Sequence, residues 1–389
     1  MYQRIAFFVQ ISNADAISKA ATLNKKKQDE LKIAKNNIIE NIHDSVRLNN
    51  LPVFTDYFSK LKPDVKLRSE LAAVAIQNGS LAIFKFLVQQ GLNLKEKDSE
   101  GFSYLHTAVF YNQLPLCQYL VEAGLDINAI DENRSVFILA SNSSIAVVEY
   151  LLNKKINTDN DPDFVNEAIR YGKPELAQYM MKRGFKFNTD IFDNDKLLVD
   201  FIEQDDVATF SFLLGQGLDI NKNIKYRMEK STLLYMAVLL NSPKVAMFLL
   251  NKGANSNVYS RNDALFAYAI NFENKDLLNT LYDKGANLEA ITGMNKQTPL
   301  VFAFKLNRID VIMMLINRGA KLDHPSGDDK NMPLHLAAAA GYLDAVKLMI
   351  KKGANPNAKN GEDKTALDSA IENGQKAVEK YLATVTKKK

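Results

Sequence analysis

The sequence holds 389 residues, of which 47% are hydrophobic and 24% charged, with 49 lysines and arginines against 45 aspartates and glutamates. This composition fits a chain that folds around a buried core, and it excludes collagen-like and predominantly disordered proteins. A net charge of only +4 argues against a nucleic-acid-binding protein. The single cysteine, Cys117, excludes an intrachain disulfide and fits a reducing, cytoplasmic compartment.

The N-terminal residues 1–35 are predicted to be helical. Their longest apolar run, residues 5–9, is too short to cross a bilayer, which takes about 20 apolar residues. No other stretch is a better candidate, so we expect no membrane span. The stretch KKKQDELKIAK at 25–35 mixes charges and is typical of a solvated helix face. We expect residues 1–35 to form a helical cap over the open end of the structure that follows.

From about residue 36 onward, one pattern recurs along the chain. Apolar residues at helical spacing precede a series of glycines that lie roughly 33 residues apart. Each unit is therefore predicted to hold two helices, the second of which ends at a glycine in the left-handed conformation. An alanine stands sixteen positions before seven of these glycines, in the pairs Ala75 and Gly91, Ala108 and Gly124, Ala168 and Gly184, Ala237 and Gly253, Ala269 and Gly285, Ala303 and Gly319, and Ala337 and Gly353.

Two units carry the pattern most fully. Residues 298–321 read TPLVFAFKLNRIDVIMMLINRGAK, and residues 332–357 read MPLHLAAAAGYLDAVKLMIKKGANPN. Proline fits the first turn of a helix, and Thr298 can cap that helix through its hydroxyl, whereas Met332 cannot. With this turn, helix pair and glycine loop, the chain resembles the ankyrin-repeat family from about residue 36 to about 384.

The resemblance implies an all-α fold: an ankyrin-type α-solenoid of about eleven stacked helix-turn-helix repeats with short, hairpin-like connecting fingers. We expect an elongated stack, because each unit buries one face only against its neighbours. Residues 36–66 are predicted to be a degenerate first repeat, residues 67–384 the remaining repeats, and residues 385–389 a frayed tail.

Several central units depart from the family pattern. The unit over residues 132–158 is one residue short and has Lys155 in place of the glycine, and a later unit has Phe201 in place of the alanine. We expect the stack to bend or loosen between about residues 130 and 215.

The histidines and the cysteine are the first candidates for chemistry. His43, His106 and His335 share one repeat position, where the resemblance implies a local hydrogen bond that fixes the start of a helix. A reactive histidine needs a nucleophile, acid or metal partner, and nothing in the sequence supplies one. Cys117 stands where other units have valine, alanine or leucine, so we expect it to be buried and unreactive. Metal-binding and nucleotide-binding motifs are absent from the sequence, and we expect no enzyme activity and no cofactor.

Candidate binding residues are taken from the concave side, which ankyrin-like proteins usually present to their partners. Aromatic and arginine side chains are enriched at binding hot spots, although some of these residues could instead pack between repeats. The basic insert over residues 221–231 is either a solvated loop or a contact for an acidic partner. The candidates are Phe110, Tyr111, Arg170, Tyr171, Leu239, Phe272 and Lys305 on the first helices, and Tyr226 and Arg227 in the insert.

Together these observations favour a non-enzymatic protein–protein interaction scaffold that is monomeric and cytoplasmic and holds a protein partner on its concave face. A secreted effector of an intracellular bacterium, acting in the host cytosol, is a narrower form of this hypothesis. The alternative is a targeting module for an enzymatic or toxin activity in residues 1–66. That segment leaves little room for a catalytic core.

Overall fold

The computed structural model describes residues 36–386 except residues 99, 261–262, 294–296 and 326–328, and before residue 36 only six positions, at 25–26, 28–29 and 32–33. Those six positions are helical. Otherwise the predicted cap over residues 1–35 lies outside the described residues, as do residues 387–389 of the predicted tail. The chain divides into two compact units, Met1–Asn188 and Thr189–Lys389.

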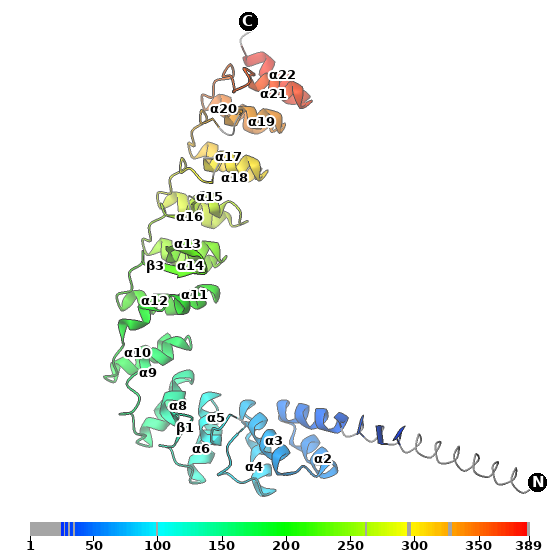
Figure 1. The fold of residues 1–389 in the computed structure, drawn as a ribbon, viewed down its shortest axis with the longest axis vertical. Coiled ribbons are helices and arrows are strands. Elements are labelled where there is room, and N and C mark those ends of the chain that lie inside the picture. The colour runs from blue at the N-terminus through cyan, green and yellow to red at the C-terminus, as the bar shows by residue number, and fades with distance from the viewer. Residues whose placement is uncertain are drawn as a thin grey trace, which may run out of the picture. The chain divides into compact units, whose positions relative to one another are not determined.

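The first unit is built from successive helix pairs, each of which corresponds to one predicted repeat (Figure 1). A short hairpin of β1 (Ile130–Asp131) and β2 (Arg134–Ser135) connects two of the pairs. The pairs are residues 36–47 with α2 (Leu51–Leu61), α3 (Val65–Gln77) with α4 (Leu81–Gln89), α5 (Tyr104–Phe110) with α6 (Leu114–Glu122), α7 (Val136–Leu139) and η1 (Ala140–Asn142) with α8 (Ile145–Asn153), and α9 (Phe164–Arg170) with α10 (Pro174–Lys182).

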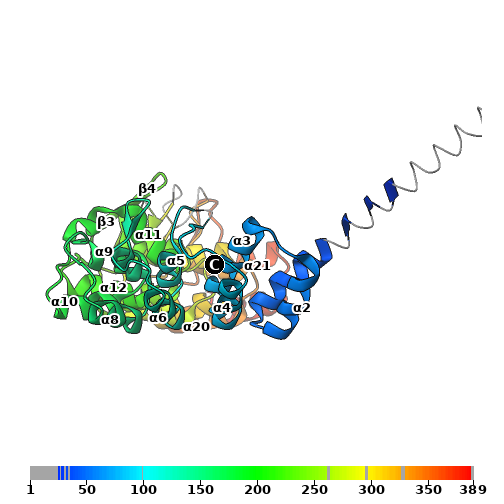
Figure 2. The ribbon, with the colours of Figure 1, turned by 90° about the horizontal axis from the view of Figure 1, so that it is seen from below.

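The second unit repeats this arrangement. After η2 (Thr189–Asp193), its pairs are α11 (Asp195–Glu203) with α12 (Val207–Gly215), α13 (Leu233–Leu239) with α14 (Pro243–Asn251), α15 (Leu265–Ala269) with α16 (Lys275–Asp283), α17 (Pro299–Lys305) with α18 (Ile309–Asn317), α19 (Pro333–Ala339) with α20 (Leu343–Lys351), and α21 (Ala366–Glu372) with α22 (Lys376–Val385). Two antiparallel hairpins connect pairs here, β3 (Asn223–Tyr226) with β4 (Glu229–Thr232) and β5 (Tyr259–Ser260) with β6 (Asp263–Ala264). Figure 2 shows the β3–β4 hairpin standing out from the helices. Over the described residues this makes eleven helix pairs, and the all-α prediction is confirmed.

The residues that were predicted to begin a helix, to end one or to lie between packed helices do so in the structure, with the exception of one histidine. Thr298 accepts a hydrogen bond from the backbone N–H of Val301, whereas the side chain of Met332 makes no such cap. Gly253 ends α14 with φ of 96°, a conformation that glycine adopts without steric cost. The repeat alanines are fully buried, and Phe201 in the alanine position is buried too. The bulkier residue is thus accommodated inside the second unit.

A second left-handed position closes the loop between the two helices in nine of the eleven pairs. It lies four residues after the repeat alanine or its substitute. Glycine, asparagine and aspartate occupy it, the residue types that tolerate positive φ best. Its members are Asn49, Gly79, Asn112, Gly172, Asp205, Asn241, Asn307, Gly341 and Gly374, all with positive φ.

The predicted first repeat packs directly on its neighbour. The buried hydroxyl of Ser80 donates a hydrogen bond to the carbonyl oxygen of Val46 over 2.8 Å. The ring of Phe86 lies 5.8 Å from that of Phe54 and 5.2 Å from that of Phe58. The described residues 36–61 therefore share one hydrophobic core with the rest of the first unit.

One histidine differs from its prediction. His43 lies inside the helix over residues 36–47, which begins no later than residue 36. It therefore does not fix the start of a first helix, and that prediction is wrong. The helix extends further towards the N-terminus than a standard first helix, so the shared sequence position no longer coincides with a helix start.

Candidate functional site

A serine, a histidine and an aspartate meet in the first unit, a cluster that the sequence analysis did not predict. The Oγ atom of Ser103 lies 2.7 Å from Nδ1 of His106, and a carboxylate oxygen of Asp131 lies 3.0 Å from the same nitrogen. The opposite nitrogen, Nε2, lies 3.2 Å from the carbonyl oxygen of Arg134. A catalytic triad needs the serine and the aspartate on opposite ring nitrogens, so this trio cannot relay a proton from serine to histidine.

The trio serves the connection between two repeats. Asp131 belongs to β1. Its carboxylate also accepts a hydrogen bond from the backbone N–H of Ser103 at 2.9 Å and forms an ion pair of 2.7 Å with Lys97. Burial lowers the pKa of His106, against the opposing effect of the Asp131 carboxylate. A buried histidine that ties its own helix to the next hairpin is a structural residue.

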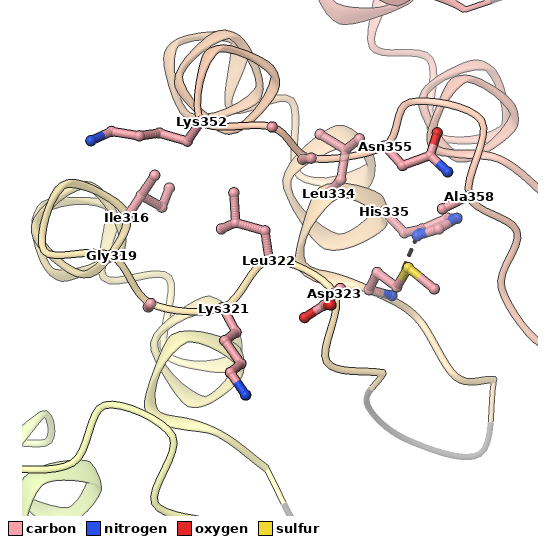
Figure 3. Close-up of a pocket in the computed structure, with 14 residues that line it drawn as sticks. Ile316, Gly319, Lys321, Leu322, Asp323, Leu334, His335, Lys352, Asn355 and Ala358 are labelled. Atoms are coloured by element: carbon pink, nitrogen blue, oxygen red, sulfur yellow. Dashed lines mark hydrogen bonds between the residues drawn. The ribbon is translucent and has the colours of Figure 1, made fainter.

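His335 borders a hollow of about 480 Å³ between neighbouring repeats of the second unit (Figure 3). Its Nδ1 accepts a hydrogen bond from the backbone N–H of Met332 at 3.3 Å, and its Nε2 lies 3.0 Å from the carbonyl oxygen of Lys364. Both ring nitrogens are therefore occupied by backbone groups. A general base needs a free lone pair within reach of its substrate, which His335 does not have.

The remaining chemical candidates are equally inert. Cys117 is fully buried, and this burial raises the pKa of its thiol to about 12, so the nucleophilic thiolate does not form near neutral pH. Among the described residues, no three histidine, cysteine, aspartate or glutamate side chains are grouped so that they could hold a metal ion. Over the same residues, no helix is long and apolar enough to cross a membrane.

Three of the predicted binding residues lie together in the first unit. The ring of Phe110, at the end of α5, lies 5.3 Å from that of Tyr111 and 6.0 Å from that of Tyr171, which follows α9. Both contacts are edge-on. Tyr111 is 41% exposed, and the other two rings are half-buried. Phe110, Tyr111 and Tyr171 are called the aromatic surface below.

A hollow of about 130 Å³ lies beside Phe110 and Tyr111. Phe102 adds a third ring to its wall, and the carboxylates of Asp98 and Glu100 line it as well. These three residues come from the finger before α5, so the hollow lies between a finger and a first helix. It combines apolar and acidic walls, as a site for an amphipathic side chain would.

A second hollow, of about 260 Å³, lies beside Tyr171. Asp161, Asp163 and Glu167 supply its carboxylates, and Arg134 lines both hollows. The two hollows are therefore neighbours, with the aromatic surface between them.

Arg170, another of the predicted binding residues, lies at the end of α9. Its guanidinium forms an ion pair of 2.5 Å with Glu167, three residues earlier on α9. The arginine thus already has a carboxylate partner, and its charge is offset inside the unit.

Tyr226 and Arg227 lie on the β3–β4 hairpin, into which most of the basic insert folds, and its contact with an acidic partner stays a prediction. The hydroxyl of Tyr226 donates to Glu203 at the end of α11 over 3.2 Å, and the guanidinium of Arg227 lies 5.0 Å from the centre of the Tyr226 ring. The hairpin is held against α11 by these contacts. Met228 at its tip is 83% exposed.

The last three candidates are dispersed over the second unit. Leu239 ends α13 and is half-buried. The Phe272 ring lies 5.8 Å from that of Tyr268, in a half-buried pair. Lys305 is exposed at the end of α17 and lines a hollow of about 330 Å³ that Tyr268 also borders. None of the described contacts joins these three residues into one cluster.

The arrangement of helix pairs and fingers agrees with comparisons with known proteins. A family model described as ankyrin repeats matches residues 42–131, 266–360 and 322–389, together more than half of the chain. The chain belongs to the ankyrin-repeat family. Repeats of this family are protein–protein interaction modules, and the family is generally non-enzymatic.

Three relatives are each about a quarter identical to the chain over the stretches that align with it. It is 27% identical over 246 residues to the ankyrin repeat protein FPV244 of Fowlpox virus, a match of 57% of this chain and 36% of the viral protein. It is 25% identical to an ankyrin repeat protein of Borreliella burgdorferi over 28% of this chain and 50% of that protein. A third relative is alpha-latrotoxin-Lg1a of Latrodectus geometricus, 26% identical over 54% of this chain and 14% of the toxin. The chain thus spans half or less of the length of these relatives.

Proposed function

We propose that the protein is a non-enzymatic, monomeric scaffold that binds a protein partner through the concave side of its repeats, centred on the aromatic surface. The carrying observation is the contact between Phe110 and Tyr171, which brings aromatic rings from non-adjacent repeats into one patch. Tyr111, beside them, is 41% exposed. Exposed aromatic side chains next to hollows are the usual anchors of a protein interface.

The alternative, an enzymatic or toxin activity in residues 1–66, has less support. Most of residues 36–61 belong to two helices that pack on the next repeat through Ser80 and Phe86. A segment that packs on its neighbour as one more repeat has its apolar surface committed to that role. The geometry of Ser103, His106 and Asp131 likewise supports scaffolding and not catalysis.

A secreted effector of an intracellular bacterium, acting in the host cytosol, is a narrower form of the proposal. It concerns where the scaffold acts and leaves its binding surface unchanged. A translocation assay with a reporter fused to the chain would test it, and a reporter retained in the bacterium would speak against it.

The binding surface is tested with the intact chain. A pull-down from cell lysate, read by mass spectrometry, supplies the partner, and its affinity is then compared between the wild type and the double variant Tyr111→Ala, Tyr171→Ala. Loss of a hot-spot aromatic costs about 2 kcal/mol or more, so we expect at least a roughly thirtyfold loss of affinity. Tyr259→Ala is the matched control, because Tyr259 is 49% exposed on a finger of the second unit.

Thermal unfolding of the same variants separates binding from packing. A double variant that unfolds like the wild type and has lost its affinity supports the proposal. A stable double variant that binds as before places the partner elsewhere. If the double variant is unstable, Tyr111→Phe together with Tyr171→Phe keeps the rings packed and tests whether the hydroxyls contact the partner.

A further inference from the structure

The walls of the two hollows are acidic, although the chain as a whole carries a net charge of +4. Asp98 and Glu100 line the first hollow, and Asp161, Asp163 and Glu167 line the second. Against these five carboxylates, the only cationic residue among the lining residues is Arg134. The local charge around the aromatic surface is therefore opposite in sign to that of the whole molecule.

Neighbouring cations, Arg134 included, offset this acidity only in part. The ammonium group of Lys97 forms an ion pair of 2.7 Å with Asp131, and the guanidinium of Arg170 forms an ion pair with Glu167 only. The carboxylates of Glu100 and Asp163 lie on exposed residues at the rims of the two hollows. Asp98 and Asp161 accept hydrogen bonds from Thr107 and Ser135. Among the described residues the carboxylates of Glu100 and Asp163 have no such partner, so an incoming cation would meet open carboxylate oxygens on both sides of the aromatic rings.

The rings themselves are open to a cation. Elsewhere the chain covers aromatic faces with its own basic side chains, as with Arg318, which lies 4.2 Å from the centre of the Tyr282 ring, and Arg183, which lies 4.7 Å from that of Tyr179. Within the described part of the chain, no lysine or arginine lies over Phe110, Tyr111 or Tyr171 in this way. Ring faces flanked by carboxylates attract a guanidinium or ammonium group.

We propose that the aromatic surface binds a basic segment of the partner, with an arginine or lysine side chain seated against the rings of Tyr111 and Tyr171 and its charge between Glu100 and Asp163. This inference rests on the proposed function and names the chemistry of the partner. The apolar part of the basic side chain would cover Phe110, and its charged end would lie at the carboxylates. Long basic side chains pack in this way on surfaces that are partly apolar and partly charged.

The test uses the full chain and a phage library of random twelve-residue peptides. Peptides are selected on the wild type, and each is then measured on the double variant Tyr111→Ala, Tyr171→Ala. We expect the peptides that depend on the two tyrosines to be enriched in arginine and lysine. Replacing the basic residue of a selected peptide by glutamine should weaken its binding at least tenfold.

Charge-neutralising variants sharpen the test. Glu100→Gln and Asp163→Asn should each weaken the selected basic peptides by about three- to tenfold, more strongly at low salt, since exposed charges are screened by ions. Glu273→Gln, at an exposed position of the second unit, should leave their affinity unchanged.

The outcomes separate the two proposals. Tyrosine-dependent peptides that are apolar or acidic would overturn the basic partner and leave the aromatic surface as the binding site. Peptides that bind the double variant as well as the wild type would overturn the site itself. A concentration-dependent dimer that the double variant no longer forms would make a second copy of the chain the occupant, and would also contradict the inference.

Discussion

The Nε2 atom of His335 donates a hydrogen bond to the carbonyl oxygen of Lys364, 3.0 Å away in the next repeat. The same side chain accepts from Met332 through Nδ1, so one imidazole joins a helix start to the following finger. His106 makes the equivalent bridge to Arg134 at 3.2 Å. These histidines hold neighbouring repeats in register.

Replacing His335 by glutamine should therefore cost stability. Glutamine can restore one of the two hydrogen bonds, and the lost bond is worth about 1 kcal/mol in the free energy of unfolding. Urea unfolding of His335→Gln measures this. His324→Gln, in a connecting loop, is the control and should change the free energy by less than about 0.5 kcal/mol. An equal effect of both variants would show that His335 makes no special contribution.

The contribution of His335 should also depend on pH. Burial lowers its pKa in the folded chain below the ordinary value of 6.5, so below that pH the unfolded chain binds more protons at this residue. Its stabilising effect is thus fully present above pH 6.5 and is lost as the pH falls towards the folded pKa. The difference between the wild type and His335→Gln should shrink from pH 8 to pH 5. A constant difference would contradict the lowered pKa.

Gly341 should tolerate alanine less well than Gly319. Both have positive φ, which costs an alanine about 1 kcal/mol. A Cβ at Gly341 would lie 2.3 Å from the side-chain oxygen of Gln375, whereas a Cβ at Gly319 would meet nothing within 4 Å. Gln375 would have to move and give up its hydrogen bond to Ala339, which adds about 1 kcal/mol. Chemical unfolding of the two variants should show this difference.

Asp205 acts as a helix cap across a repeat boundary. Its carboxylate accepts from the backbone N–H groups of Lys244 at 3.2 Å and Val245 at 2.8 Å, in the first turn of α14. Asp205→Ala should lower the free energy of unfolding by about 2 kcal/mol, because it removes this cap and places alanine at positive φ. Asp205→Asn keeps an acceptor and should cost less than 1 kcal/mol. An asparagine variant as unstable as the alanine variant would contradict capping as the cause.

The helix pairs could be predicted because their signals are local. Pro243 at a helix start and Gly253 at its end act on their own neighbours only. The left-handed residue after each first helix could have been found as well, because glycine or asparagine recurs at that spacing. This position is less conspicuous than the glycine of the second helix, because its residue varies between glycine, asparagine and aspartate.

The contacts of the candidate site were harder to predict. The trio of Ser103, His106 and Asp131 joins residues 28 apart in the chain, and its geometry depends on how the finger packs. The β3–β4 hairpin also had little signal, since its turn at Arg227 and Met228 lacks the glycine or asparagine typical of short hairpins. The acidic walls appear only once fingers and first helices are brought together.

The hydrogen bonds between Ser80 and Val46, between Val245 and Asp205 and between His335 and Lys364 share one property: each joins a repeat to its immediate neighbour. A gene encoding such a chain can gain or lose a whole repeat, and the new neighbours need only match at one boundary. Length can then change during evolution in steps of about 33 residues without a common core being rebuilt. Relatives of quite different length can accordingly share a long aligned stretch with this chain, as the viral protein and the toxin do.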